Sequence, residues 1–322
     1  MSFHGKLLRR NSHLLSIIIY SHTYIGVSVR CVKDGPTKPR ATFSIDPPRG
    51  TTSTIFQFDA SGCTDFETAT ANLEVRWDWN GDSIWDTGFD KVKTISHQFA
   101  SPGSYTVILQ VKDADGLVDN EANTIYVGEG LLTDTRDGRD YAYKAIGTQT
   151  WMIENLAYLP AVSSSSTGSA TSPLYYVYGY EGESPSDAKA TMNFTTYGVL
   201  YNWEAAKSAC PSGWHLPSEE DWNILTDYLG MNAGGKMKES GTWHWSRPNT
   251  GATDSSGFTS LPGGYRFNTG GFKNLNNNNH LWSSSTNGEL YAWYRSLSYD
   301  SNGIDRRSGS RNNGLSVRCL RD

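Results

Sequence analysis

Apolar and polar positions alternate along the first half of the chain, in short segments separated by turns. Residues 105–111 (YTVILQV) are the clearest case, because the turn-forming strings PG and DADG lie on either side of them. In an extended chain this alternation places successive side chains on opposite faces. Similar segments surround it: ATFSI, TIFQFDAS, LEVRWDWNGD and ANTIYV. The pattern predicts an antiparallel β-sandwich of about ninety residues.

The pattern changes after residue 128. Residues 137–156 predict a hairpin, because alternating segments flank a Gly-Thr-Gln turn, whereas the Ser- and Gly-rich stretch 161–193 is expected to be an exposed insertion. Two helices are predicted further on: a short one at 203–209, and a longer one capped by Ser218 with acidic residues at 219–221. The apolar stripe of the longer helix consists of Trp222, Leu225 and Leu229.

Composition and charge exclude several partners. The net charge is −5 and no basic stripe is present, so a nucleic-acid partner is not expected. No run of about 18 apolar residues predicts a transmembrane helix. The apolar patch at 14–20 follows basic residues but is short and precedes no small-residue cleavage site, so the chain shows no convincing signal sequence.

Three strings in the first half carry a family resemblance: FDASGCTDFE (58–67), VRWDWNGDSIWDTG (75–88) and HQFASPGSYTVILQVKDADGLVDN (97–120). They resemble the polycystic kidney disease (PKD) domain family over residues 41–128. The resemblance implies an immunoglobulin-like sandwich that serves as a spacer or a modest interaction module on extracellular proteins.

The string DWNGDSIWD within this region has oxygen-bearing side chains at alternate positions, as calcium sites require. The candidate ligands are Asp78, Asn80, Asp82 and Asp86. The preferred interpretation is that these aspartates cap turns between two strands, because no Glu closes the site and the Gly is displaced from its place in a calcium loop. Calcium is the only cofactor that the sequence suggests.

A second resemblance covers residues 129–322. The strings DGRDYAYKAIGTQTWMIENL, YGVLYNWEAA, ACPSGWHLPSEEDWNIL, GFTSLPGGYR, LWSSS and GLSVRC occur in this order, as in the Fibrobacter succinogenes major paralogous domain family. That family belongs with extracellular bacterial proteins, and its sequences resemble the C-type-lectin-like and formylglycine-generating-enzyme-like fold. We therefore expect a multi-domain chain, with an all-β immunoglobulin-like PKD sandwich followed by an irregular α+β, C-type-lectin-like domain.

The last residues of the chain, GLSVRCLRD (314–322), have a near copy in GVSVRCVKD (26–34). Residues 1–34 are therefore interpreted as the end of a preceding domain of the same family, in which Cys31 has lost its partner, and residues 35–40 as a linker. In the final copy, alternation places Cys319 on the same face as Leu315 and Val317. Cys210 is its one partner within the domain, so we predict a Cys210–Cys319 disulfide and an oxidising compartment.

Catalytic signatures are weak. The formylglycine-generating enzymes need two thiols that this domain is expected to use in a disulfide, and the acid of a lectin-type calcium loop is missing at Arg247-Pro-Asn. His215 is expected to be a hydrogen-bonded core residue, and His244 an exposed one without a carboxylate partner. We expect a protein without enzymatic activity.

Aromatic and arginine side chains in the last third suggest a binding surface instead. Residues 290–299 alternate between two faces that are not expected to be both core. The main alternative is that most of these aromatics pack inside the domain, and for Trp293 the two interpretations are balanced. The candidate ligand-binding residues are Trp243, Trp245, Arg247, Tyr265, Arg266, Tyr291, Trp293, Arg295 and Tyr299.

Residues 287–313 are rich in amino acids that adenine mutation of asparagine-like codons can produce. This composition suits a hypervariable target of a diversity-generating retroelement, although an ordinary polar loop is the favoured interpretation because Asn also suits turns. The sequence as a whole predicts a non-enzymatic extracellular or cell-surface protein that binds or displays, with a glycan or protein ligand and the PKD unit as spacer. The remaining alternative is a formylglycine-generating-enzyme-like protein with a degenerate site.

Overall fold

The computed structural model of the chain describes residues 8–10, 13–15 and 35–322. Strands β1 (Leu8–Arg10) and β2 (His13–Leu15) pair antiparallel. The interpretation of residues 1–34 as the end of a preceding domain, with an unpaired Cys31, rests on residues 26–34, which lie outside the described part. Among the described residues, no helix is long and apolar enough to cross a membrane.

The first domain consists of two sheets that enclose an aromatic core. Phe56 and Phe58 point into this core, whereas Gln57 between them is exposed, as the alternating pattern predicts. Val107 and Val111 reach the same core from the opposite sheet. One sheet has the order β3 (Ser44–Asp46), β5 (Phe56–Asp59), β7 (Thr94–His97), and the other β4 (Arg49–Thr51), β9 (Val118–Gly128), β8 (Gly103–Lys112), β6 (Glu74–Asp78). The predicted sandwich is confirmed.

The second domain contains two further sheets and is mostly β. The predicted hairpin is present as β11 (Arg139–Ile146) and β12 (Gln149–Met152), and Gly147 takes the positive φ of 63° that its turn requires. The smaller sheet adds β10 (Gly130–Asp134), β22 (Leu320–Arg321) and β15 (Trp214–His215). The larger sheet consists of β13 (Tyr175–Tyr176), β14 (Leu200–Tyr201), β21 (Leu315–Ser316), β18 (Asn278–Asn287), β16 (Gly263–Arg266), β17 (Phe272–Leu275), β19 (Tyr291–Ser298) and β20 (Asp305–Ser310).

Helix α4 (Glu219–Leu229) begins after Ser218, as the sequence predicts. Ser218 accepts a hydrogen bond from the backbone of Asp221, and the Asp221 carboxylate accepts one from the backbone of Ser218, which completes a capping box. The apolar stripe of the helix is buried. The remaining helices are short: α1 (Pro185–Lys189), α2 (Met192–Tyr197), α3 (Trp203–Ala206) and α5 (Ala233–Met237).

The stretch 161–193 is not an exposed insertion. Val162, Val177 and Ala188 are buried in the domain core, and Asn202 holds the stretch by donating to the backbone oxygens of residues 169 and 172. The prediction was wrong because the Ser- and Gly-rich composition concealed isolated apolar residues that pack individually.

Strands β18 and β19 divide the second domain into two apolar cores. Trp282 and Ala292 point into one core, and Leu281 and Leu297 point into the other, beside the apolar stripe of α4. Strand β19 therefore has core residues on both faces, and the expectation that the two faces of residues 290–299 are not both core is wrong. Helices and long loops supply enough apolar side chains to cover both sides of these strands.

The predicted disulfide between Cys210 and Cys319 is confirmed, with a sequence separation of 109. It fixes the loop after α3 to the last segment of the chain. Cys63, in the first domain, is a buried free thiol.

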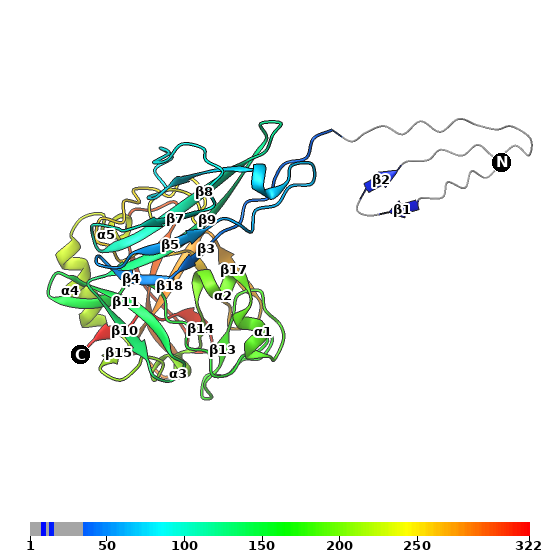
Figure 1. The fold of residues 1–322 in the computed structure, drawn as a ribbon. Helices are drawn as coiled ribbons and strands as arrows, with labels where there is room; N and C mark the ends of the chain where they lie inside the picture. The colour runs from blue at the N-terminus through cyan, green and yellow to red at the C-terminus, as the bar shows by residue number, and fades with distance from the viewer. Residues whose placement is uncertain (1–7, 11–12, 16–34) are drawn as a thin grey trace, which may run out of the picture.

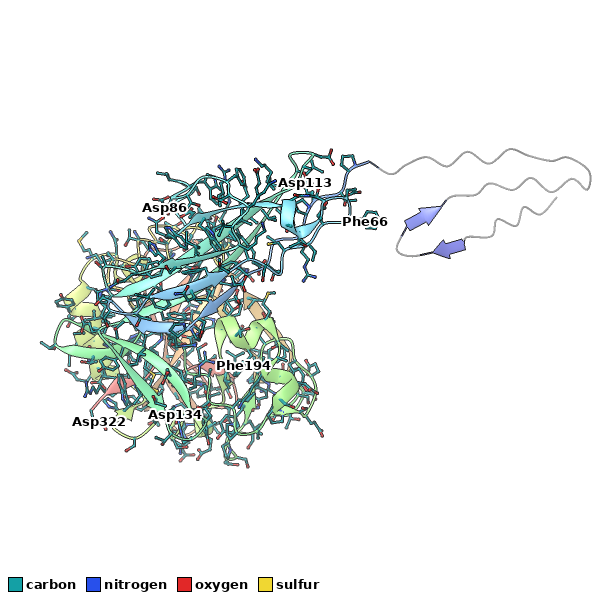
Figure 2. The ribbon with its side chains drawn as sticks, in the orientation of Figure 1. Phe66, Asp86, Asp113, Asp134, Phe194 and Asp322 are labelled. Carbon is teal, nitrogen blue, oxygen red and sulfur yellow. A yellow bond between two sulfur atoms is a disulfide. The ribbon has the colours of Figure 1, made fainter. Side chains whose placement is uncertain are left out.

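The two domains meet directly. Strands β4 and β9 of the first domain lie beside β10 and β11 of the second (Figure 1), and Glu129 alone separates β9 from β10. A Cβ on Gly128 would lie 2.4 Å from the carbonyl oxygen of Gly130, so glycine is required at this close approach. Figure 2 shows Phe66 and Asp113 at the end of the first domain that is remote from this junction, and Asp322 in the second domain.

A buried ion pair joins the domains at the junction. The Nε of Arg49 lies 2.5 Å from Oε1 of Glu154, and a terminal nitrogen of Arg49 lies 2.5 Å from Oε2. A terminal nitrogen of Arg139 approaches the same carboxylate at 3.3 Å. The side chain of Glu154 is 3% exposed, so this contact is shielded from water.

Candidate functional site

A cavity of about 560 Å³ lies over the sheet formed by β18, β19 and β20, and we call it the sheet groove. Its position follows from the register of β18 and β19, which pairs Asn278 with Ser298 and His280 with Ser296. Because these side chains share one face of the pleat, the register brings them together. Further aromatic rings and side-chain amides in the lining come from Tyr265, Phe267, Tyr291, Tyr294, Asn268, Asn274 and Asn313.

Three polar atoms in the lining of the sheet groove are buried without a hydrogen-bond partner among the described residues. They are Nδ1 of His280, Oδ1 of Asn268 and Oδ1 of Asn313. Tyr265 and Tyr294 contact His280 edge-on, with ring centroids 4.9 and 5.2 Å from its own. Burial, together with the charge of nearby Arg307, lowers the pKa of His280 to about 4, so the imidazole is neutral at physiological pH.

The charged side chains of the sheet groove already have partners. Arg307 and Asp305 form an ion pair of 2.6 Å, and this hydrogen bond raises the pKa of Arg307 above its usual value. Asp300 accepts a hydrogen bond from the hydroxyl of Ser298. The free hydrogen-bonding capacity of the groove therefore belongs mainly to neutral groups.

Three of the nine predicted ligand-binding residues are buried and structural. Arg266 donates to the backbone oxygens of Ser165 and Thr167 and so anchors the loop that contains them. Arg295 donates to Glu219 and Asn223, both in α4. The indole of Trp245 donates to the backbone of Ser260. These predictions were wrong because residue type alone does not distinguish an arginine or tryptophan that is hydrogen-bonded inside the protein from one on a binding surface.

The other six predicted residues are distributed over several surfaces. Tyr265 and Tyr291 line the sheet groove, and the side chain of Tyr291 is 49% exposed. Trp293 stacks under the guanidinium of Arg306 at 3.5 Å. The remaining three do not line the groove: Trp243 and Arg247 are exposed, and Tyr299 packs against the core of α4.

His280, Tyr294, Asn268 and Asn313 are groove residues that the sequence reasoning missed. A partial signal existed, because in an extended segment at residues 280–286 alternation places His280 on the face opposite Leu281. The register that sets His280 beside β19 depends on long-range pairing, which one sequence does not reveal.

The structure corrects both histidine predictions, although His215 is hydrogen-bonded as expected. His215 is partly exposed, and its Nδ1 lies 2.7 Å from the carboxylate of Asp322. His244 has a carboxylate partner, because its Nδ1 lies 2.9 Å from both oxygens of Glu239. The Glu239–His244 contact closes a loop between α5 and the following segment, and Glu239 also accepts a hydrogen bond from Thr106 of the first domain.

The calcium candidates accept hydrogen bonds from the backbone of their own loop. Asp78 accepts from the backbone nitrogens of residues 80, 81 and 83 at 3.2, 2.7 and 2.9 Å. Asp82 accepts from Ile84, and Asp86 accepts from Trp79. Asn80 accepts from the backbone of Asp82. Within residues 35–322 and the two short N-terminal strands, no group of three His, Cys, Asp or Glu side chains could hold a metal.

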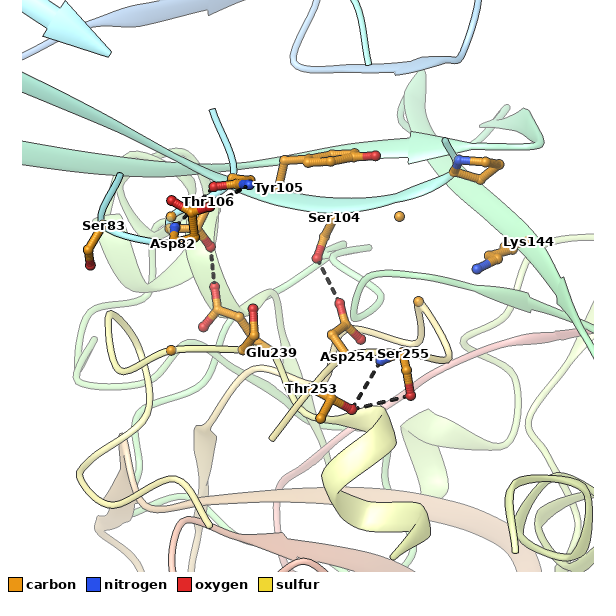
Figure 3. Close-up of a pocket in the computed structure, with 17 residues that line it drawn as sticks. Asp82, Ser83, Ser104, Tyr105, Thr106, Lys144, Glu239, Thr253, Asp254 and Ser255 are labelled. Atoms are coloured by element: carbon orange, nitrogen blue, oxygen red, sulfur yellow. Dashed lines mark hydrogen bonds between the residues drawn. The ribbon is translucent and has the colours of Figure 1, made fainter. Parts of the chain in front are cut away.

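A second cavity, of about 600 Å³, lies between the domains (Figure 3). Thr106 donates to Glu239 at 2.7 Å, and Ser104 donates to Asp254 at 3.1 Å, so hydroxyls of β8 meet carboxylates of the second domain. Thr259 donates to Asp254 through both its backbone and its hydroxyl. Burial raises the pKa of Asp254 to about 7, although these hydrogen bonds oppose the shift.

Comparison with known proteins agrees with both sequence resemblances. Residues 145–321, more than half of the chain, match the model of the Fibrobacter succinogenes major domain, and residues 37–127 match the PKD domain model. No curated protein matches the chain.

Several solved structures are similar to parts of the chain. A structure of carbohydrate-binding modules from the β-sandwich superfamily is 19% identical to this chain, with a TM-score of 0.27. The match covers 52% of this chain and 54% of that one, so this chain spans about half the length of that structure. The PKD1 domain of Vibrio anguillarum Epp is 21% identical over 29% of this chain and 96% of that domain, with a TM-score of 0.23. A PKD domain of an M14-like peptidase from a Thermoplasmatales archaeon is 20% identical over 30% and 98%, with a TM-score of 0.23.

Proposed function

We propose that this chain, which belongs to the Fibrobacter succinogenes major domain family, is a non-enzymatic extracellular or cell-surface protein. In this proposal the PKD domain precedes the family domain, and the ligand binds in the sheet groove of the family domain. The finer fold assignment, a C-type-lectin-like second domain, is part of this proposal. The disulfide supports an oxidising compartment, because such bonds persist mainly outside the cytosol.

The observation that carries the proposal is the set of unpartnered atoms in the sheet groove. A buried polar atom without a hydrogen bond costs on the order of 1–3 kcal/mol, and native proteins contain few of them. The groove combines three atoms in this condition, from His280 in β18 and from Asn268 and Asn313 in loops that line the same cavity. A ligand that hydrogen-bonds to these residues recovers part of that cost, which gives affinity and specificity together.

We take a neutral, hydroxyl-rich glycan as the ligand class. Hydroxyl groups both donate and accept, so they can satisfy amide oxygens and a neutral imidazole alike. The rings of Tyr265, Tyr291 and Tyr294 offer apolar surface for the C–H face of a sugar. A protein ligand is the alternative, and the experiment below distinguishes the two.

We propose a function without catalysis because the alternative that the sequence left open, a formylglycine-generating type of enzyme, needs two free thiols. Cys210 and Cys319, the thiols that a formylglycine-generating type of oxidation would use, form a disulfide. Calcium at Asp78, Asn80, Asp82 and Asp86 stays a prediction, and the turn-capping bonds of these side chains favour a structural role.

The location of residues 287–313 favours a second candidate, a hypervariable binding face. This segment includes β19 and β20 and supplies Tyr291, Tyr294 and Arg307 to the groove. Variation there would change ligand contacts while β18 stays constant. A near copy of the coding segment that differs only at adenines would support this candidate, and its absence from the surrounding DNA would remove it.

A glycan array tests the main proposal with the wild type, Tyr291→Ala and His280→Phe. Tyr291 is half exposed, and His280→Phe replaces the imidazole and its unpartnered atom by a ring of similar shape, so both variants are expected to fold. Tyr228→Ala, on the outer face of α4, is the matched control because Tyr228 is 65% exposed and lies outside the groove. We expect the two groove variants to lose at least about tenfold in affinity for a neutral glycan, equivalent to one good hydrogen bond or ring contact, and the control to keep it.

Binding that all three variants retain would move the site elsewhere. Failure on every glycan, followed by capture of a purified protein that Tyr291→Ala abolishes, would replace the glycan by a protein ligand.

A further inference from the structure

A third cavity, of about 810 Å³, lies between the two domains, and we call it the junction cleft. Its first wall is the face of β9 that carries Asn120, Ala122, Thr124 and Tyr126. This face points away from the sandwich core, because the intervening Ile125 is among the buried core residues of the first domain. Ala122 and Thr124 on this face are small, which leaves room for the cleft.

The second domain supplies the opposite wall. Helix α2 contributes Met192 and Tyr197, and the segment after α5 contributes Trp243 and His244. Trp243 is 40% exposed and Met192 is 76% exposed. An indole and a thioether at the mouth of a cleft provide an apolar platform for a ring-shaped ligand.

Positive charge exceeds negative charge at one end of the junction cleft. Arg49 and Arg139 both line it and share the single carboxylate of Glu154. Arg49 occupies both oxygens of that carboxylate at 2.5 Å, whereas Arg139 approaches it only at 3.3 Å. Glu121 also lines the cleft, and it interacts with Arg40.

Two polar atoms of the cleft lining have no hydrogen-bond partner within the described part of the chain. The Nε of Arg139 and the hydroxyl oxygen of Thr124 are buried and have no partner among the described residues. An unpaired guanidinium nitrogen is the costlier of the two, because it belongs to a charged group. Its natural partner is a carboxylate, to which arginine donates strong, charge-assisted hydrogen bonds.

We propose that the junction cleft binds a carboxylate-bearing sugar, with the carboxylate on Arg139 and the sugar ring against Trp243. The site requires both domains, because β9 forms one wall and α2 the other. It is independent of the sheet groove and would remain if the groove had no glycan ligand.

Isothermal titration of the full chain with digalacturonic acid and with its uncharged counterpart galactobiose tests the proposal. We expect binding of the acid, and binding of galactobiose weaker by at least about tenfold, the value of one charge-assisted hydrogen bond. Arg139→Gln and Trp243→Ala should each weaken binding of the acid by a similar factor. Arg321→Gln removes an exposed positive charge outside the cleft, and His280→Phe alters only the groove, so both should bind the acid as the wild type does.

Trp243→Ala keeps the test valid if Arg139→Gln unfolds, because the half-exposed indole has little packing to lose, and thermal unfolding of each variant shows which of them is folded. Equal binding of the two sugars, no binding of the acid, or unchanged binding by folded Arg139→Gln and Trp243→Ala would overturn the proposal.

Discussion

The domain junction and the sheet groove both bury polar side chains, but they differ in how these side chains are paired. At the junction, Glu154 holds Arg49, Glu239 accepts from Thr106, and Asp254 accepts from Ser104. In the groove, His280, Asn268 and Asn313 keep atoms without partners. The contacts that join the domains are thus paired, whereas the groove, like Arg139 and Thr124 in the junction cleft, keeps atoms without described partners. Each prediction below tests one side of that contrast.

The largest effect is expected from Glu154→Gln. This change leaves Arg49 and Arg139 buried without a carboxylate, and breaking a buried ion pair costs roughly 3–5 kcal/mol. Urea unfolding should show a loss of that order in the free energy of unfolding. Glu204→Gln is the control, because Glu204 pairs with Lys207 on the surface at 2.9 Å and surface pairs contribute about 1 kcal/mol or less.

Similar losses in the two variants would contradict the view that the Arg49–Glu154 contact fastens the domains. A loss confined to an early, separate unfolding transition would localise the effect to the junction rather than to either core.

A smaller, pH-dependent effect is expected at Asp254. Burial raises its pKa in the folded chain to about 7, whereas its ordinary value is 3.8, so the protonated form is favoured by folding. The stabilisation is complete below about pH 4 and disappears as pH rises through about 7. Asp254→Asn mimics the neutral acid. Between pH 5 and pH 7 its free energy of unfolding should therefore rise relative to that of the wild type by roughly 2 kcal/mol, at about 1.4 kcal/mol per pH unit.

Thermal unfolding across this pH range measures the difference between the two curves. Asp227→Asn, at an exposed position of α4, should run parallel to the wild type. Parallel curves for Asp254→Asn as well would mean that Asp254 ionises in the folded chain as it does in water.

The parts of the fold that local pattern determines could be predicted from sequence, and the parts that depend on register could not. Alternation at Phe56 and Phe58 and the Ser218 capping box are local, and both are present in the structure. The groove depends on which residues of β18 and β19 face each other. The sequence indicated Tyr265 and Tyr291 but missed His280, because its setting arises from pairing with a strand that lies later in the chain.

The junction was the least predictable region. The PKD unit was expected to act as a spacer, yet its outward face on β8 and β9 packs against the second domain through Thr106 and Tyr126. No local signal distinguishes a threonine that will meet Glu239 from one on an open surface. The same difficulty explains Arg266 and Arg295, whose partners lie far away in the sequence.

The smallest effect, and the sharpest form of the contrast, concerns two threonines that face each other across β8 and β9. Thr106 and Thr124 are cross-strand neighbours, so they share strand geometry and the same face. The hydroxyl of Thr106 donates to Glu239, whereas the hydroxyl of Thr124 is buried without a described partner.

Valine keeps the shape of threonine and suits a strand. Thr106→Val should therefore cost about 1–2 kcal/mol by depriving a buried carboxylate of a donor, and Thr124→Val should be neutral or slightly stabilising. Urea unfolding of the two variants measures the difference. Equal costs would show that burial alone, and not pairing, governs these positions, whereas a cost confined to Thr106→Val would show that the Thr106–Glu239 hydrogen bond helps to hold the two domains together.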